Sequence, residues 1–347
     1  MLAFLVPGRG ISSLMRTAAL LACLLLAILP GTALAHEKWF TDSLWHPTEW
    51  GLVLSGRTAL ALGAGIALVA VLALGQRLAG DPGWPRLPFL NRMAGGDVKL
   101  LAVQTAISLI YMAVRLALLV PQLSLPQAPL GFALAIAQLA VAFSLISGVL
   151  DRAGALLLLL LALPVLLLFG PLNLLAQAHY AGIALMVLLV GANREMEHPR
   201  PPFNAPVWTE RGVAALRIST GIAFLALALG DKVWNPDLGI AFLERYPHFN
   251  VAQSLAGLPV SNEAFLLGAG VIETAAGLAL LSGYLTRVVI LVLLVPFNLT
   301  VPFLPAEEIL GHLPIFGILY VLLVHGAGTL RSGGTPTITR QVSDIKR

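Results

Sequence analysis

Residues 153–171 read AGALLLLLLALPVLLLFGP, and this stretch decides the class of fold. The leucines at 156–161 do not alternate with polar residues, as the strands of a membrane β-barrel do. As a helix, this segment rises about 28 Å, close to the roughly 30 Å of the hydrocarbon core of a bilayer. A helix also pairs its backbone polar groups within the segment, as the bilayer requires. The stretch therefore predicts a membrane-spanning helix.

Eight more apolar segments after residue 35 are long enough to span a bilayer: 52–75, 100–120, 130–150, 176–192, 212–230, 264–283, 287–304 and 309–327. The composition agrees, because 58% of the 347 residues are hydrophobic and only 11% are charged. That charged fraction is under half of the roughly 25% found in soluble domains. It excludes an ordinary soluble enzyme, a disordered chain and a nucleic-acid-binding domain. The sequence predicts an all-α membrane protein with about nine spans.

The first 35 residues predict a secretory signal peptide. Two arginines precede an apolar core at about 17–29, and Ala33-Leu34-Ala35 supplies the small-x-small pattern of a cleavage site. Cleavage there would make His36 the first residue, and its α-amine and ring nitrogen suit Cu(II). It would also remove Cys23, the only cysteine, and with it thiolate chemistry. An uncleaved anchor or a lipidated Cys23 is the alternative.

The basic residues predict the orientation of the spans. With the mature N-terminus outside, only Lys38, Lys232 and Arg245 face outward. The C-terminus is then cytoplasmic, and the chain is expected in a bacterial inner membrane. The inward loops and the tail carry thirteen basic residues: Arg77, Arg86, Arg92, Lys99, Arg152, Arg194, Arg200, Arg211, Arg287, Arg331, Arg340, Lys346 and Arg347.

An internal duplication divides the chain. A shift of 135 residues lays Gln138–Gly191 over Glu273–Gly326 without a gap, and the most informative match lays Ser147–Arg152 over Ser282–Arg287. Upstream the shift is 115, because about 20 residues are inserted between Pro236 and Glu263. Both units start and end inside, so they are parallel repeats. The predicted parts are a signal peptide (1–35), an exported segment with the first span (36–98), a first four-helix repeat (99–192), a cytoplasmic linker (193–210), a second four-helix repeat (211–327) and a cytoplasmic tail (328–347).

Glu273 is the sharpest candidate for a functional residue. It lies near the middle of the predicted span 264–283, where a carboxylate costs several kcal/mol unless it is protonated or paired. Its counterpart in the first repeat, Gln138, keeps the hydrogen bonding but carries no charge. Titratable chemistry is therefore expected in the second repeat. The alternative is a protonated Glu273 that makes a structural hydrogen bond between helices.

A second polar group is predicted at the outer ends of the sixth and ninth spans. Lys232 could pair there with Glu307, Glu308 or Glu273, and His312 opens the last span. The alternative is anchoring at the membrane surface, because lysine snorkels and acids favour a helix start. The predicted ligand or proton site comprises Glu273, Lys232, His312, Glu307, Glu308 and Asn298, the last of which marks an irregular eighth span.

Metal and catalytic motifs are few. His179 and His312 could hold a haem between the repeats, but they lack a ligand spacing such as i, i+4. Copper at His36 is the other metal hypothesis. The P-loop, H-E-x-x-H and G-x-S-x-G motifs are all missing from the sequence. The expectation is a non-catalytic subunit rather than a self-contained enzyme.

The second repeat resembles the DoxX-like membrane proteins over Arg211–Gly326. The resemblance rests on Arg217, Val271-Ile272-Glu273, Ser282–Arg287, Pro296–Thr300 and Gly311-His312-Leu313-Pro314. The opening His36–Phe40 is similar to the start of the larger, double-unit members. The first repeat looks like a degenerate copy. The resemblance implies a four-helix membrane unit, and some relatives are the membrane subunit of a thiosulfate:quinone oxidoreductase, while others are linked to redox stress.

Together these observations predict an integral inner-membrane protein with an outward-facing polar site. The leading expectation is a subunit or accessory of a quinone-linked redox system, with the bilayer and a redox protein as partners and quinone as the expected ligand. A transporter of small solutes or copper is one alternative, because a mid-membrane carboxylate between repeats also suits transport. An assembly protein without a ligand is the other.

Overall fold

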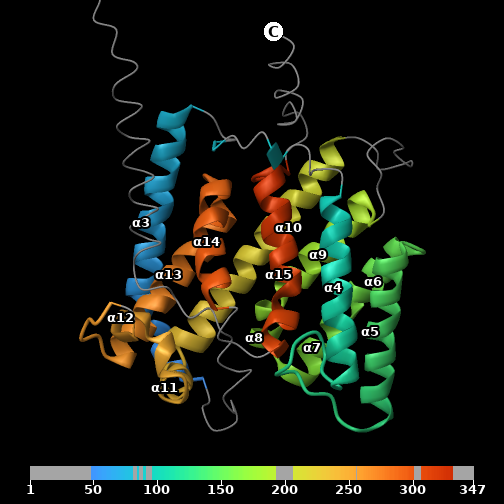
Figure 1. The fold of residues 1–347 in the computed structure, drawn as a ribbon, viewed down its shortest axis with the longest axis horizontal. Helices are drawn as coiled ribbons and strands as arrows, with labels where there is room; N and C mark the ends of the chain where they lie inside the picture. The colour runs from blue at the N-terminus through green and yellow to red at the C-terminus, as the bar shows by residue number, and fades with distance from the viewer. Residues whose placement is uncertain are drawn as a thin grey trace, which may run out of the picture.

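The computed structural model describes residues 48–80, 84–85, 89–90, 96–192, 206–254, 256–300 and 306–330. These residues form a bundle of helices that run mostly side by side between two ends (Figure 1). The described residues contain no β-strand, and an isolated β-bridge joins Ala117 to Ser124. The predicted signal peptide, His36, most of the predicted linker and most of the predicted tail lie outside the described residues. For the part that is described, the all-α expectation is confirmed.

The helices follow one another along the chain with short connections. Three irregular turns accompany them: η1 (Trp50–Leu54), the π-helical turn η3 (Ala228–Val233) that continues α10, and η4 (Pro247–Phe249). The helices are α3 (Gly56–Ala79), α4 (Asp97–Val114), α5 (Pro129–Ser147), α6 (Asp151–Leu160), α7 (Ala162–Phe169), α8 (Pro171–Ala176), α9 (Ala178–Val190), α10 (Pro206–Leu227), α11 (Pro236–Arg245), α12 (Val251–Ser254), α13 (Asn262–Ser282), α14 (Thr286–Thr300) and α15 (Ala306–His325).

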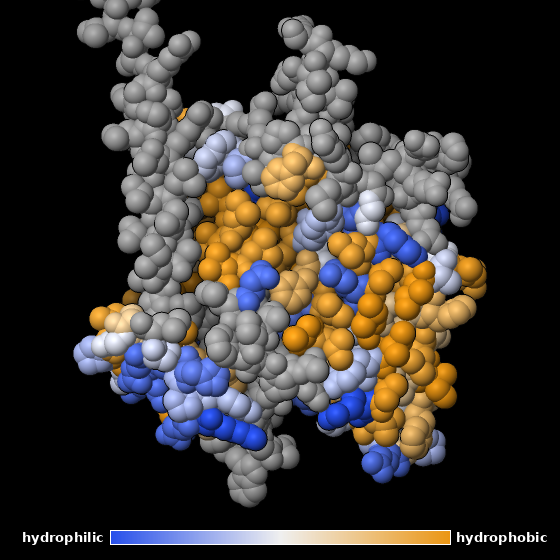
Figure 2. Space-filling view, viewed as in Figure 1, coloured by the Kyte–Doolittle hydropathy of each residue, from blue (hydrophilic) through white to orange (hydrophobic). Residues whose placement is uncertain are grey.

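Six helical segments among the described residues are long and apolar enough to cross a membrane: Gly56–Leu78, Asp97–Val114, Pro129–Ser147, Asp151–Phe169, Val207–Val233 and Asn262–Ser282. The other three predicted spans fall on shorter apolar helices, at Ala178–Val190, Thr286–Val295 and Ile309–His325. Large hydrophobic side chains on α3, α5, α6 and α7 point outward, and Figure 2 shows a broad apolar face. The molecule is therefore a multi-pass membrane protein, and the count of nine spans stays a prediction.

The helices pack in two sets, which we call the first half (α4–α9) and the second half (α10–α15). In the first half α4 contacts α5, α5 contacts α6, and α9 contacts both α6 and α4. In the second half α10 contacts α13, α13 contacts α14, and α15 contacts both α14 and α10. The halves meet at two junctions, one where α10 contacts α9 and the neighbouring α8, and one where α15 contacts α4. The first and last helices of each half therefore pack against helices of the other half.

Matching turns end the second long helix of each half. α5 ends at Gly148 (φ 70°) and α13 at Gly283 (φ 74°), both in the left-handed region that glycine adopts at low cost. Leu150 (φ 55°) and Leu285 (φ 43°) follow just before α6 and α14 begin. The two glycines are 135 positions apart in the sequence, and so are the two leucines, which is the shift of the predicted duplication.

α3 has no counterpart in the first half and lies along α13. Two features lie at the end of the bundle where α11 lies (Figure 1). The first is a small separate core, made by side chains of α11, η4, α12 and the start of α13: Phe242, Leu243, Phe249, Ala252, Phe265 and Leu266. The second is the turn η3, which contacts both α3 and α13. The predicted insertion after Pro236 therefore folds as a cap on the second half.

Candidate functional site

Lys232 and Glu273 form a buried ion pair. Lys232 Nζ lies 3.2 Å from Glu273 Oε2, and the two residues are 4% and 5% exposed. Lys232 belongs to the π-helical turn η3, and such turns occur frequently at functional sites. Gly270 permits the approach of η3 to α13, because a Cβ there would lie 3.2 Å from Lys232 Cβ. The sequence offered Lys232 three acidic partners, and the structure places it against Glu273.

Gln138, the predicted counterpart of Glu273 in the first half, makes an uncharged contact. The Gln138 amide accepts a hydrogen bond from the N–H of Leu119 at 2.8 Å and donates to the carbonyls of Leu109 and Ala117 at 2.9 and 3.2 Å. Gln138 thereby fastens α5 to the turn after α4, as Glu273 fastens α13 to the turn after α10. Buried charges are retained at a desolvation cost of several kcal/mol per ion. The amide in the first half shows that a helix connection of this kind does not require charge.

The remaining predicted site residues are placed differently. His312 is buried, with 4% exposure, on the first turns of α15. Asn298 is exposed and donates to the carbonyl of Leu294 on its own helix at 2.7 Å, so it does not join the buried group. Glu307 and Glu308 belong to the first turn of α15, and their side chains lie outside the described residues.

Further buried polar groups belong to single polar residues within apolar helices. Thr274 follows Glu273 and is 0% exposed, and its hydroxyl has no hydrogen-bond partner in the described structure. At the break between α8 and α9, the same holds for Gln177 Oε1 and His179 Nδ1, in residues that are each 5% exposed. Single polar residues in apolar helices gave the only advance sign of this group.

A metal centre receives no support from the described side chains. Among them, no group of three or more His, Cys, Asp or Glu residues is arranged to hold a metal ion. His36, the predicted copper ligand, lies outside the described residues. Haem ligation by His179 and His312 stays a prediction, and copper at His36 does too.

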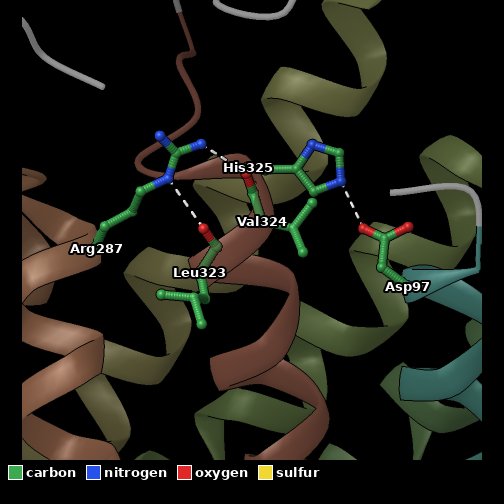
Figure 3. Close-up of polar contacts among 5 residues, drawn as sticks. All are labelled: Asp97, Arg287, Leu323, Val324 and His325. Atoms are coloured by element: carbon green, nitrogen blue, oxygen red, sulfur yellow. Dashed lines mark hydrogen bonds and ion pairs between the residues drawn. The ribbon is translucent and has the colours of Figure 1, made fainter. Parts of the chain in front are cut away.

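The opposite end of the bundle carries a second polar network (Figure 3). Arg287 at the start of α14 donates to the carbonyls of Leu323 and Val324 at 2.9 and 2.6 Å, which satisfies two backbone acceptors at the end of α15. Beside them the Nε2 of His325 donates to the carboxylate of Asp97 at 2.5 Å. Both residues of this pair are buried, with exposures of 8% and 2%. The network joins α4, α14 and α15.

Two more cations bind backbone carbonyls at this end. Arg217 of α10 donates to the carbonyl of Leu281 and to that of Ala327, both at 2.8 Å. Lys99 of α4 donates to the carbonyl of Ile146. Leu281 and Ile146 hold the same place at the ends of α13 and α5. Cations favour helix C-termini, where the carbonyls carry partial negative charge. Because backbone groups are the acceptors, these contacts leave no side-chain pattern in the sequence.

Comparison with known proteins leaves the chain without an assigned relative. No protein-family model matches it, and neither a curated protein nor a solved structure matches it. The resemblance of Arg211–Gly326 to DoxX-like proteins therefore stays a prediction. Because a fold alone does not define an activity, the function is argued from the buried group around Lys232 and Glu273.

Proposed function

We propose that this chain is an integral membrane protein that binds the head group of a quinone at Lys232 and Glu273, as a subunit of a membrane redox system. One observation carries the proposal: the second half keeps a buried ion pair where the first half uses the neutral Gln138. Charged residues inside a membrane are rare and mark functional sites. The resemblance to DoxX-like proteins points the same way.

The chemistry of the pair suits this ligand. A quinone presents carbonyl oxygens that accept hydrogen bonds, and the ammonium of Lys232 is a strong donor. A quinol presents hydroxyl groups, which donate, and the carboxylate of Glu273 accepts. Thr274 and His312 add buried polar groups on α13 and α15. The proposed role of this chain is binding, with electrons delivered by a partner redox protein.

The wider organisation is part of the proposal. The first half (α4–α9) and the second half (α10–α15) are taken as two copies of one four-helix unit, arranged in parallel. Their matching helix contacts and their paired left-handed turns support this. The α11 end is taken as the outer face of a bacterial inner membrane and the Asp97–His325 end as the inner face. This placement follows the distribution of basic residues in the sequence.

Binding of a tailless benzoquinone to the protein in lipid nanodiscs tests the proposal. Quenching of tryptophan fluorescence reports binding, because Trp234 lies two residues after Lys232 and donates to Thr58 Oγ1 at 3.0 Å. We expect saturable binding in the wild type and at least about tenfold weaker binding in Lys232→Met, a loss of about 1.4 kcal/mol. Lys99→Met is the matched control, since it removes a lysine bound to a backbone carbonyl at the other end.

The double variant Lys232→Met/Glu273→Gln guards against misfolding, since it leaves no unpaired charge. It should fold and fail to bind. Wild-type affinity in both the single and the double variant would overturn the proposed site.

A further inference from the structure

The turn that carries Lys232 is held by a segment from outside its own half. The carbonyl of Trp234, two residues after Lys232, accepts a hydrogen bond from the N–H of Glu49 at 2.7 Å. The indole Nε1 of Trp234 donates to Thr58 Oγ1 at 3.0 Å. Both partners of Trp234 belong to the stretch made by η1 and the start of α3, residues 49–58, which we call the strap.

The first half holds the corresponding turn from within. The predicted duplication pairs Trp234 with Leu119, by the shift of 115 that applies upstream of the insertion. The carbonyl of Leu119 accepts a hydrogen bond at 2.9 Å from the hydroxyl of Tyr180, on α9 of the same half. The shift of 135 pairs Tyr180 with Ile315, whose side chain has no hydroxyl to donate. The strap thus supplies from outside the hydrogen bond that Tyr180 makes in the first half.

The strap is held by polar contacts and buries little of its own surface. None of the residues of η1 is buried, and Trp50 and Leu54 are 66% and 97% exposed. An ion pair between Arg57 and Glu263 ties the start of α3 to α13, and exposed ion pairs of this kind add little stability. Elements that open locally are those with few buried apolar contacts. Release of the strap therefore costs a few hydrogen bonds and little apolar burial.

The rest of α3 is packed more firmly. A Cβ added at Gly65 would lie 2.6 Å from Leu278 Cδ1, so α3 and α13 are in close contact there. Near the other end of α3 the N–H of Leu285 donates to Gln76 Oε1 at 2.9 Å. Movement of the strap therefore leaves most of α3 in place.

The buried ion pair needs an opening of this kind. Lys232 and Glu273 are 4% and 5% exposed, so a ligand reaches them only when a neighbouring element moves. We infer that the strap is a gate for this site: bound to Trp234 it closes the turn η3, and released it gives access to the ion pair. The gate rests on the proposed function and adds the step by which a ligand enters, as lids do in many proteins.

Thiol reactivity tests the gate without a ligand. Val233→Cys places a reporter beside Lys232 at a position that is 0% exposed, in a Cys23→Ser background, and a maleimide labels the protein in nanodiscs. Thr58→Val keeps the shape of the side chain but removes the acceptor for Trp234 Nε1. It should speed labelling at least about tenfold, because a weaker strap is open more often.

Thr105→Val is the matched control. Thr105 is also buried, but its hydroxyl donates to the carbonyl of Leu101 within α4, in the first half. This variant should leave labelling of the reporter unchanged. Equal labelling rates in Thr58→Val and Thr105→Val would overturn the gate.

Locking the strap tests the gate with a ligand and needs no reporter cysteine. Arg57→Cys and Glu263→Cys are joined by a bifunctional methanethiosulfonate, which a reducing agent removes, and quenching of tryptophan fluorescence follows association of the tailless benzoquinone. The crosslink should slow association at least about tenfold, and reduction should restore the rate. Equally fast association with the crosslink in place overturns the gate and leaves the head-group site standing. A probe that binds neither the wild type nor Thr58→Val overturns the proposed function, while the labelling rates still decide whether the strap opens.

Discussion

Asp97 at the start of α4 accepts a hydrogen bond from His325 at the end of α15, across 228 residues of sequence. The contact closes one of the two junctions between the halves (Figure 3). The other junction, between α9 and α10, is apolar at the same level: a Cβ added at Gly212 would lie 2.6 Å from Met186 Sδ and 3.5 Å from Val190 Cγ2. The α4–α15 junction thus includes a buried polar pair, whereas Gly212 packs against apolar side chains of α9.

We expect His325→Leu to reduce the free energy of unfolding by about 1–3 kcal/mol, because it leaves the buried Asp97 carboxylate without this donor. His325→Gln should lose less, since an amide can still donate. Thermal unfolding in mild detergent measures both. Equal stability of the leucine variant and the wild type would contradict the expectation.

The ion pair at Lys232 and Glu273 predicts strong non-additivity. Lys232→Met or Glu273→Gln alone should cost about 3–5 kcal/mol, because each leaves one buried charge unpaired. The double variant should be more stable than either single variant, since it reproduces the uncharged connection that Gln138 makes. A thermal-unfolding double-mutant cycle gives the coupling energy. Losses that simply add would mean that the two side chains act independently.

The crossing of α10 and α13 predicts a sensitive glycine. A Cβ added at Gly277 would lie 3.0 Å from the carbonyl oxygen of Gly221 and 2.9 Å from Leu225 Cγ, so Gly277→Ala should push the helices apart. Gly268 on the same helix has open space, and Gly268→Ala should be neutral or slightly stabilising. The melting temperatures of the two variants measure the contrast. Similar values would argue against close packing at Gly277.

The proposed orientation predicts which ends of the bundle react from outside the cell. Asp237 on α11 and Leu330 after α15 are both exposed, and they lie at opposite ends. A cysteine at position 237 should react with a membrane-impermeant maleimide in intact cells, and one at position 330 only after lysis. The reverse pattern would invert the topology and place the Lys232 end inside.

The predicted signal peptide is tested by intact-mass measurement of the protein extracted from membranes. The expected chain begins at His36 and contains no cysteine, because Cys23 has been removed. A chain that retains residue 1 would eliminate the copper hypothesis, which needs the free α-amine of His36.

Hydropathy alone predicted the long apolar helices of the described residues, six of which are long enough to cross a membrane, but not their ends. The predicted span 100–120 corresponds to α4, which begins at Asp97 and ends at Val114. A hydropathy profile does not include the buried Asp97 in the span, because this residue is polar and its hydrogen-bond partner, His325, is distant in the sequence. It also extends past Val114, because the turn that follows is apolar, with left-handed backbone at Leu116 and Leu119. In such a turn the conformation depends on tertiary contacts, among them those from Gln138.

The polar group was predictable in part. A carboxylate in an apolar helix and a lysine at a helix end are visible in any hydropathy profile, and both belong to the observed pair. The choice of Glu273 as partner was not predictable, because it depends on the π-helical turn η3 and on the small Gly270 opposite it. The Asp97–His325 contact joins residues that are 228 positions apart in the sequence, and no local pattern connects them.

The fastening of α3 and α4 to late helices constrains how the protein is assembled during synthesis. α3 waits for α13, because Arg57 pairs with Glu263 and Gln76 with Leu285, each more than 200 residues downstream. α4 waits for α15. The early helices must therefore stay in the bilayer with incomplete neighbours while the ribosome makes the rest. Non-local contacts of this kind slow folding, so these junctions are expected to form late, after α13 and α15 have been synthesised.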